Sequence, residues 1–256
     1  MRINEEGWPV TELGDRYKDL VIPCHVSRTL PLDTGEPLGV VWHYDAIHKD
    51  VQLAPRLVGA AGDKGASKRN VSWHVQIMRT GKRVWSVPAV RGGRHVGKPG
   101  KIRGKVRSAN RNLVAVELAG AGHLHRVGDR FYASWKRDKD GVERKALGPD
   151  PKTEIPKARV YGGHSGIPAQ EAFTDAQEAS ALELCNALLA GFDLGVADLQ
   201  YTHEFFDRPR KGDPGAAWCV ARLPRILGQC RDSTPEGYNA FTRVKTQIDK
   251  LIGKRW

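Results

Sequence analysis

Long hydrophobic runs are missing from this chain of 256 residues. No stretch approaches the roughly 20 consecutive apolar residues that a membrane-spanning helix needs. The N-terminus carries Glu5 and Glu6 where a secretory signal peptide has an apolar segment. We therefore predict neither a transmembrane helix nor a signal peptide, and expect a globular protein that stays in the cytosol or leaves it by another route.

Cysteine is scarce, and its pattern argues against two kinds of scaffold. The four cysteines, Cys24, Cys185, Cys219 and Cys230, show no CxxC spacing. In a chain of this size, we expect reduced thiols rather than a disulfide framework. A zinc site built from cysteines is not expected either.

Acidic residues are absent from residues 91–107, although seven Lys or Arg lie there. The whole chain has a formal net charge of +12 at pH 7. This charge predicts affinity for a polyanion, with simple solubility as the alternative interpretation. The cations are not interleaved with stacking aromatics in a recognisable module, so we expect no specific nucleic-acid partner. The glycines of residues 91–107 predict a basic loop.

The apolar pattern alternates between strand-like and helix-like segments, which predicts an α/β fold. Strands are expected at residues 39–43, on both sides of a turn at residues 80–81, at residues 112–118 and at residues 196–202. A helix should begin after Thr174, because residues 174–177 form a capping box. Its apolar face should contain Ala179, Leu182, Cys185, Leu188 and Leu189. Further helices are expected at residues 49–60 and after Thr234.

No linker or repeat indicates a second domain, so we expect residues 1–256 to form a single domain. Its expected parts are an irregular leader at 1–36, a core at 37–217 that contains a charged insertion at 124–170, and a helical extension at 218–256. Within the insertion, residues 131–135 are expected to form a short strand.

Three chemically suggestive residues lie close together in a segment rich in proline and glycine. They are His203, Lys211 and Asp213. A further histidine, His43, ends an apolar run far upstream. Imidazole and carboxylate groups suit Zn²⁺, and three ligands leave one coordination position free, as a catalytic zinc site requires. Taken singly, each histidine could be an ordinary strand-end residue, and Asp213 could cap a turn.

Five ordered blocks between residues 38 and 217 resemble motifs of the zinc-dependent N-acetylmuramoyl-L-alanine amidases. That family includes phage amidase-type lysozymes, bacterial anhydro-muramyl amidases and animal peptidoglycan recognition proteins. The blocks are the strand that ends at His43, the hairpin at 72–82, the turn at 94–97, the strand at 110–118 and the segment 203–215. One block alone would be a weak signal, whereas the ordered set is specific.

The resemblance implies a central mixed β-sheet flanked by helices, with zinc in a cleft at one side. It implies that His43, His203 and Asp213 are the metal ligands. Glu117 is then expected to transfer protons, and Lys211 to stabilise the oxyanion. Without the metal, Glu117 could be a surface carboxylate and Lys211 an ordinary solvated lysine.

Three more residues, Trp73, His95 and Asn110, are expected to bind the substrate. Trp73 stands where some relatives carry a functional tyrosine, and His95 lies in the glycine-rich segment that should open to the cleft. His74 alternates with Trp73 and is expected to lie in the core or behind the ligands.

The implied reaction is hydrolysis of the amide between N-acetylmuramic acid and L-alanine in bacterial peptidoglycan. The basic surface and the expected lack of a signal peptide favour a monomeric phage endolysin, which waits in the host cytoplasm until it is released to the cell wall. Anionic wall polymers or the outer-membrane surface are further expected partners. Two alternatives remain: a peptidoglycan-binding protein without catalysis, which the presence of all three ligands disfavours, and a bacterial cell-wall recycling amidase.

Overall fold

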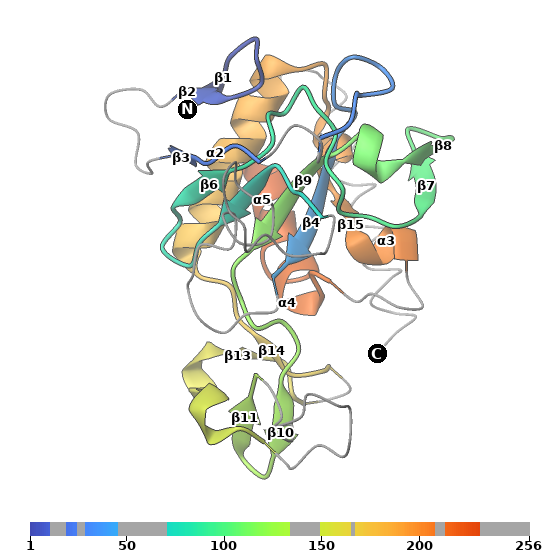
Figure 1. Cartoon of the computed structure of the whole chain (residues 1–256). Helices are drawn as coiled ribbons and strands as arrows, with labels where there is room; N and C mark the ends of the chain where they lie inside the picture. Colours follow the sequence, from blue (N-terminus) through green and yellow to red (C-terminus); the bar gives the residue numbers. More distant parts are fainter. Residues whose placement is uncertain are drawn as a thin grey trace.

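The computed structural model describes residues 1–10, 19–24, 29–45, 71–133, 149–164, 167–207 and 213–230. A six-stranded sheet lies at the centre of these residues (Figure 1). Its strands, in spatial order, are β15 (Tyr201–Thr202), β4 (Val40–Tyr44), β9 (Val114–Leu118), β5 (Val75–Ile77), β6 (Arg83–Trp85) and β3 (Asp19–Val21). Neighbouring strands are parallel except for the antiparallel β5–β6 pair. The expected α/β fold with a central mixed sheet is confirmed.

Three of the described α-helices pack on one face of this sheet. Within the described residues, the α-helices are α2 (Asp175–Gly191), α3 (His203–Asp207), α4 (Ala216–Cys219) and α5 (Leu223–Gln229). The 3-10 turns there are η2 (Ala109–Arg111), η3 (Pro151–Thr153), η4 (Lys157–Arg159) and η5 (Val196–Leu199). Of these, α2, α4 and α5 contribute to the apolar cluster on the covered face. None of the helices in the described part of the chain has the length and hydrophobicity needed to cross a membrane.

The longest helix, α2, begins as predicted. The Thr174 hydroxyl accepts the backbone N–H of Gln177, and the Gln177 side chain accepts the backbone N–H of Thr174. The predicted face is confirmed in part: Cys185 and Leu188 are fully buried, as are Ala181 and Leu184, which were not predicted. The other three residues of the predicted face are only half-buried, namely Ala179, Leu182 and Leu189. The sheet therefore contacts a face that is rotated from the one that apolar spacing suggested.

The alternation of side chains along β4 separates the core from the site. Val40 and Trp42 point toward the helices, in an apolar cluster with Trp218 of α4. Val41 points to the opposite face, which has a second apolar cluster. Since side chains two residues apart lie on the same face of a strand, His43 lies on this second face, beside Val41.

The N-terminal segment is more regular than expected. Residues 1–36 were expected to be an irregular leader, but β3 forms an edge of the central sheet, and β1 (Arg2–Ile3) pairs with β2 (Pro9–Val10). The Asp19 carboxylate on β3 accepts hydrogen bonds from buried Arg83, at 2.7 and 3.1 Å, and from the Trp85 indole at 2.8 Å. This short strand thus joins the sheet through the Asp19 side chain as well as through its backbone.

The segment predicted to be a basic loop contains a β-hairpin. Strands β7 (Pro99–Ile102) and β8 (Lys105–Ser108) are antiparallel, and they are joined by Arg103 and Gly104, whose φ angles are 47° and 76°. Two consecutive residues with positive φ match the twist of the flanking strands. The loop prediction was wrong for these residues because the cations hide the strand pattern.

The insertion forms a small lobe, defined here as the described residues of 121–171. Its strands are β10 (His125–Val127), β11 (Arg130–Tyr132), β12 (Glu154–Ile155), β13 (Val160–Tyr161) and β14 (Gln170–Glu171). Strands β10, β11 and β12 form one sheet, and β13 pairs with β14. Figure 1 shows them at the lower end of the molecule, away from the central sheet. The strand expected at residues 131–135 is confirmed as β11 over its first two residues.

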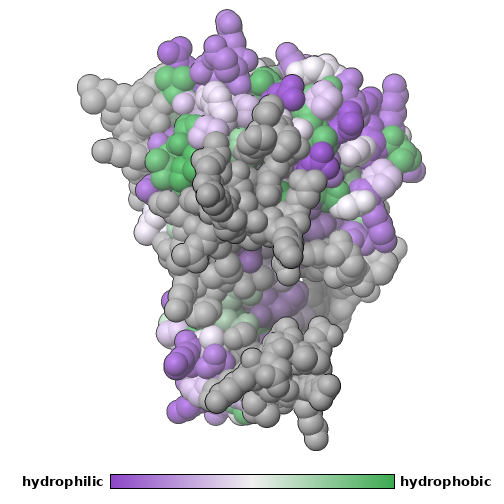
Figure 2. Space-filling model, viewed as in Figure 1, coloured by the Kyte–Doolittle hydropathy of each residue, from purple (hydrophilic) through white to green (hydrophobic). Residues whose placement is uncertain are grey.

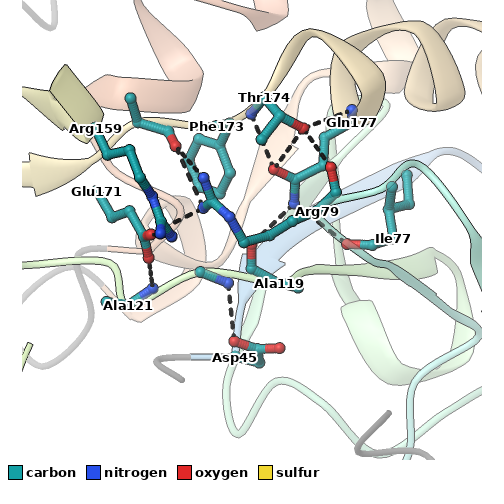
Figure 3. Close-up of polar contacts among 12 residues, drawn as sticks. Asp45, Ile77, Arg79, Ala119, Ala121, Arg159, Glu171, Phe173, Thr174 and Gln177 are labelled. Carbon is teal, nitrogen blue, oxygen red and sulfur yellow. Dashed lines mark hydrogen bonds and ion pairs between the residues drawn. The ribbon is translucent and has the colours of Figure 1, made fainter. Parts of the chain in front are cut away.

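A buried ion cluster joins the small lobe to the central sheet (Figure 3). One oxygen of the Glu171 carboxylate pairs with Arg79 at 3.0 Å and also with Arg159. The other oxygen accepts the backbone N–H of Ala121 at 2.7 Å. The Glu171 side chain is fully buried, whereas the side chains of Arg79 and Arg159 are 13% and 39% exposed. An unpaired buried charge is costly, so these contacts should be kept in the folded protein. They hold Ala121 and Glu171, the first and last residues of the lobe, next to each other.

Other predictions have mixed outcomes. All four cysteines are free, as expected. The strand expected at residues 196–202 is wrong over most of its length, because η5 precedes a strand of only two residues, β15. The helices expected at residues 49–60 and after Thr234 lie outside the described residues, as does Lys211.

Candidate metal centre

The parallel strands bring the candidate residues to one edge of the sheet. His43 lies near the carboxyl end of β4, and His203 follows directly after β15, which pairs in parallel with β4. Glu117 lies near the carboxyl end of β9, on the other side of β4. In sheets with parallel strands, ligands bind at the carboxyl ends of the strands, and the candidate site lies there.

Three candidate ligand atoms converge on one point. The Nδ1 atoms of His43 and His203 are 3.0 Å apart. The Oδ2 atom of Asp213 lies 3.2 Å from His43 Nδ1 and 3.0 Å from His203 Nδ1. All three residues are buried, with exposed fractions of 2%, 5% and 6%. Among the described residues they form a group of the kind that can coordinate a metal ion.

The chemistry of this donor set fits a divalent cation. Two imidazole nitrogens that face each other cannot both carry a proton, and a buried carboxylate needs a positive partner. A cation among the three atoms would satisfy all of them at once. Two imidazoles and one carboxylate are a ligand set that zinc uses in catalytic sites, with one position left for water or substrate.

The charge of Asp213 is already favoured by its neighbours. Burial alone would raise the pKa of this carboxyl, but its close contacts with the His203 and His43 rings bring the pKa far below its ordinary value. The ionised carboxylate acts in turn on Tyr44, since burial and then the Asp213 charge raise the pKa of that phenol to about 12. The site thus combines an ionised ligand with a neutral tyrosine.

Glu117 is placed beside the ligands by strand register. In the β4–β9 ladder it is the direct partner of His43, so the two side chains lie on the same face of the sheet. Its exposed fraction is 9%. A carboxylate that is partly buried beside a metal centre is suited to accept and return a proton. Its catalytic role stays a prediction.

Sequence reasoning missed Gln170, a residue of the small lobe that supports the Asp213 segment. Its Oε1 atom accepts the backbone N–H of Ala217 at 2.7 Å, and its Nε2 atom lies 3.4 Å from His123 Nδ1. A Cβ atom at Gly215 would lie 2.0 Å from Gln170 Nε2, so the glycine is required for this close approach. No local sequence signal marks Gln170, because its role arises from the return of the chain out of the insertion.

The three residues expected to bind substrate differ in how closely they approach the candidate ligands. Trp73 is 4% exposed and belongs to the apolar cluster on the site face of the sheet. His95 Nδ1 lies 3.3 Å from His43 Nε2, so this histidine contacts a candidate ligand. The Asn110 side-chain oxygen accepts the backbone N–H groups of His95 and Val96. Substrate binding by these residues stays a prediction.

His74 has the core position that was expected. It is fully buried, its Nδ1 atom accepts the N–H of Ala115 at 2.9 Å, and its Nε2 atom donates to the Arg91 carbonyl at 2.7 Å. Burial lowers the pKa of His74 to about 4. Burial, followed by the neighbouring histidines, also lowers the pKa of His95 well below its ordinary value. Both rings pack behind the ligands.

Comparison with known proteins gives a family and a fold. A family model described as N-acetylmuramoyl-L-alanine amidase matches residues 33–216. A solved structure of a selenomethionine derivative of AmpD has a TM-score of 0.55 at 19% identity, over 88% of this chain and 99% of that chain. No curated protein sequence matches the chain.

Two further solved structures have lower TM-scores. The E. coli N-acetylmuramyl-L-alanine amidase AmiD, solved with the substrate anhydro-N-acetylmuramic acid-L-Ala-D-gamma-Glu-L-Lys, has a TM-score of 0.46 at 17% identity, over 78% of this chain and 66% of that chain. A mutant endolysin from Bacillus subtilis has a TM-score of 0.46 at 12% identity, over 82% of this chain and 96% of that chain.

The family match covers well over half of the chain, and it includes His43, His203 and Asp213. The structural similarity to AmpD shows that this chain and AmpD share a fold. With the three candidate ligands converging at one sheet edge, the chain belongs to the N-acetylmuramoyl-L-alanine amidase family of enzymes.

Proposed function

We propose that this amidase is a zinc-dependent hydrolase, which cleaves the amide between the lactyl group of N-acetylmuramic acid and L-alanine in bacterial peptidoglycan. The observation that carries the proposal is the convergence of His43, His203 and Asp213 within 3.2 Å of one another. Glu117, next to His43 in the β4–β9 ladder, completes the set of groups that such a hydrolysis needs.

The proposed division of labour follows from the chemistry of each group. Zinc, when bound, supplies a Lewis acid and allows water to ionise near neutral pH. Glu117 accepts a proton as water adds to the amide carbonyl, and it returns the proton to the nitrogen of L-alanine as the C–N bond breaks. Lys211, outside the described residues, is proposed to stabilise the negative charge on the carbonyl oxygen. The products are a lactyl carboxylate and a peptide with a free L-alanine amine.

The proposed biological role is that of a monomeric phage endolysin. It would stay in the host cytoplasm until it reaches the cell wall, which fits a chain in which no described helix could cross a membrane. A bacterial recycling amidase would use the same chemistry. The two roles differ in substrate: an endolysin cuts intact walls, whereas a recycling enzyme prefers small soluble muropeptides.

The β7–β8 hairpin is the proposed contact with anionic wall polymers or the outer-membrane surface. Two cations at the hairpin have internal partners: Lys98, just before β7, pairs with Asp207, and Arg103, in the turn, pairs with Asp198. Lys101 and Lys105 are exposed on the hairpin itself. Figure 2 shows a mainly hydrophilic surface with scattered hydrophobic residues on the upper part of the molecule, where the hairpin lies. We therefore assign electrostatic attraction to the exposed lysines.

Metal analysis tests the zinc proposal directly. The purified enzyme is expected to contain a single zinc ion, to lose activity on soluble muropeptide in EDTA, and to regain it when zinc is added. His164→Ala, a change of an exposed histidine in the small lobe, is the matched control and should keep both metal and activity. A metal-free preparation with full activity would overturn the proposal. A zinc-loaded protein that binds muropeptide without cutting it would instead support the non-catalytic alternative.

A further inference from the structure

The two ring nitrogens of His43 have different neighbours. Its Nδ1 atom belongs to the group of three candidate ligand atoms, while its Nε2 atom lies 3.3 Å from Nδ1 of His95. The His43 and His95 rings are nearly perpendicular, with an interplanar angle of 80°. A histidine that binds a metal through one nitrogen carries its proton on the other, and that N–H needs an acceptor. His95 Nδ1 is in position to be this acceptor.

One amide side chain makes two hydrogen bonds to the backbone of the turn that carries His95. The Oδ1 atom of Asn110 accepts the N–H of His95 at 2.9 Å and the N–H of Val96 at 2.8 Å. The Val96 side chain is 4% exposed and belongs to the apolar cluster of this face. Asn110 thus fixes the turn, and Val96 fastens the turn to the core.

The other side of the turn is equally constrained. The backbone N–H of Arg94 donates to the Ser72 hydroxyl at 2.9 Å, and the backbone N–H of Ser72 donates to the Arg94 carbonyl at 3.0 Å. A Cβ atom at Gly93 would lie 2.8 Å from the Ser72 carbonyl oxygen and 3.4 Å from His95 Cδ2. Only glycine allows the turn to approach residue 72 this closely, so the His95 ring has little freedom to move.

We propose that His95 is a positioning residue for His43, and that Asn110 positions His95. His95 accepts the Nε2 proton of His43, which fixes the tautomer in which His43 Nδ1 faces the metal. This assignment replaces substrate binding as the main role of His95 and Asn110, and it rests on the proposed metal centre. Such a hydrogen bond also makes the ligand more basic, and its loss typically weakens metal binding by roughly 10- to 100-fold.

The second ligand histidine offers an internal contrast. The Nε2 atom of His203 is buried and has no hydrogen-bond partner among the described residues. Of the two candidate ligand histidines, only His43 has a described side chain, that of His95, within hydrogen-bonding distance of its Nε2 atom. The proposed support is therefore specific to one ligand.

The test compares zinc affinity in His95→Leu and His95→Asn, measured by competition with a chromogenic chelator. His95→Leu removes the acceptor and should weaken zinc binding roughly 10- to 100-fold. The side-chain oxygen of His95→Asn can take the place of Nδ1 and should restore affinity to within a few-fold of wild type. His164→Leu, in the exposed part of the small lobe, should have no effect. A second readout is KM for a soluble muropeptide at saturating zinc, which a positioning role leaves unchanged.

Each remaining outcome has a defined meaning. Unchanged zinc affinity in His95→Leu together with a raised KM would overturn the inference and restore the substrate-binding role. If wild type itself binds no zinc, the proposed function fails as well. If His95→Leu does not fold, Asn110→Ala and Asn110→Asp decide: only the latter keeps an oxygen acceptor, so only the former should weaken zinc binding. Equal zinc affinity in both Asn110 variants would then contradict the proposal.

Discussion

The two halves of the metal centre are built in different ways. His43 and Glu117 are direct partners in the five-residue β4–β9 ladder, inside the central sheet. His203 instead follows a strand of two residues, and Asp213 lies beyond the one-turn helix α3. The first half is positioned by the backbone hydrogen bonds of the sheet. The second half depends on contacts from other segments, such as the hydrogen bond that the Ala217 backbone N–H donates to the Gln170 side chain.

The strand ladder alone positions His43 and Glu117, whereas His203 and Asp213 need further contacts to hold them in place. A sheet ladder fixes its residues cooperatively, so the His43–Glu117 pair should persist without metal. The His203–Asp213 half draws its order from the small lobe and, in our account, from the bound metal. Changes in the two halves should therefore act differently on metal binding, chemistry and stability.

The largest effect should come from loss of a ligand in either half. His43→Ala and Asp213→Ala are each expected to lose zinc and to reduce kcat/KM on a soluble muropeptide by roughly 10,000-fold, because metal catalysis contributes several kcal/mol. Metal content and kcat/KM are measured on the same preparations. Retention of zinc by either variant would show that this residue is no ligand.

Glu117→Gln should separate chemistry from metal binding. Glu117 lies in the sheet-borne half, so the variant is expected to keep its fold and its zinc. Its kcat should fall by about 100- to 10,000-fold, which is the usual contribution of general acid–base catalysis. Activity within a few-fold of wild type would mean that another group transfers the proton.

In the ion cluster around Glu171, the loss of stability caused by removing a side chain should be larger when the ion pairs that are broken are more buried. Glu171→Ala leaves the Arg79 side chain, which is 13% exposed, without its carboxylate, and should cost roughly 3–5 kcal/mol in the free energy of unfolding. Arg159→Ala removes a partner that is 39% exposed, and should cost about 1 kcal/mol or less. Urea unfolding measures both variants. Equal losses would contradict the idea that Glu171 chiefly compensates Arg79.

Stability should also depend on pH through His74, the buried residue that precedes β5. The pKa of His74 is about 4 in the folded protein, compared with an ordinary value of 6.5. Between these values the unfolded chain binds a proton that the folded chain does not, so the free energy of unfolding falls as pH drops from 6.5 to 4. The loss from this residue is roughly 3 kcal/mol.

Urea titrations of wild type and His74→Gln at several pH values measure this contribution. The variant starts less stable at pH 7, because hydrogen bonds to Ala115 and Arg91 are weakened. Its stability should then decline less on acidification than that of wild type. Parallel curves for the two proteins would contradict the role of His74.

The smallest predicted effect concerns the hairpin. Lys101→Gln with Lys105→Gln should weaken binding to isolated cell walls at low salt by roughly 30-fold, since each cation near an anionic surface contributes about 1 kcal/mol. The matched control is Lys152→Gln with Lys157→Gln, two exposed lysines of the small lobe. Binding of wild type should also weaken as salt rises, because salt screens exposed charges. Equal binding from low to high salt would reject the electrostatic account.

The same contrast explains how much the sequence could predict. The apolar runs of β4 and β9 indicate buried strands, so His43 and Glu117 could be placed at strand ends from periodicity and family resemblance. The hairpin at residues 99–108 could not, because strands rich in Lys, Arg and Gly lack the apolar alternation of a half-buried strand.

Long-range contacts left no trace in local sequence patterns. Asp19 looks like part of an irregular leader, yet it completes the sheet by pairing with a buried arginine, Arg83. Gln170 lies at the end of a charged insertion, and its contact with the Ala217 backbone depends on the tertiary fold. Likewise, the glycine-rich turn around His95 suggested an open loop, whereas packing against His74 and His43 turns the ring inward.

Mass spectrometry of purified peptidoglycan after digestion tests the central claim most directly, because it identifies the bond that is broken. The account predicts stem peptides with a free L-alanine amine and glycan strands whose lactyl groups end in carboxylates, and it predicts that both products disappear in EDTA and in Glu117→Gln. New reducing ends on the sugars, or cuts within the stem peptide, would contradict it.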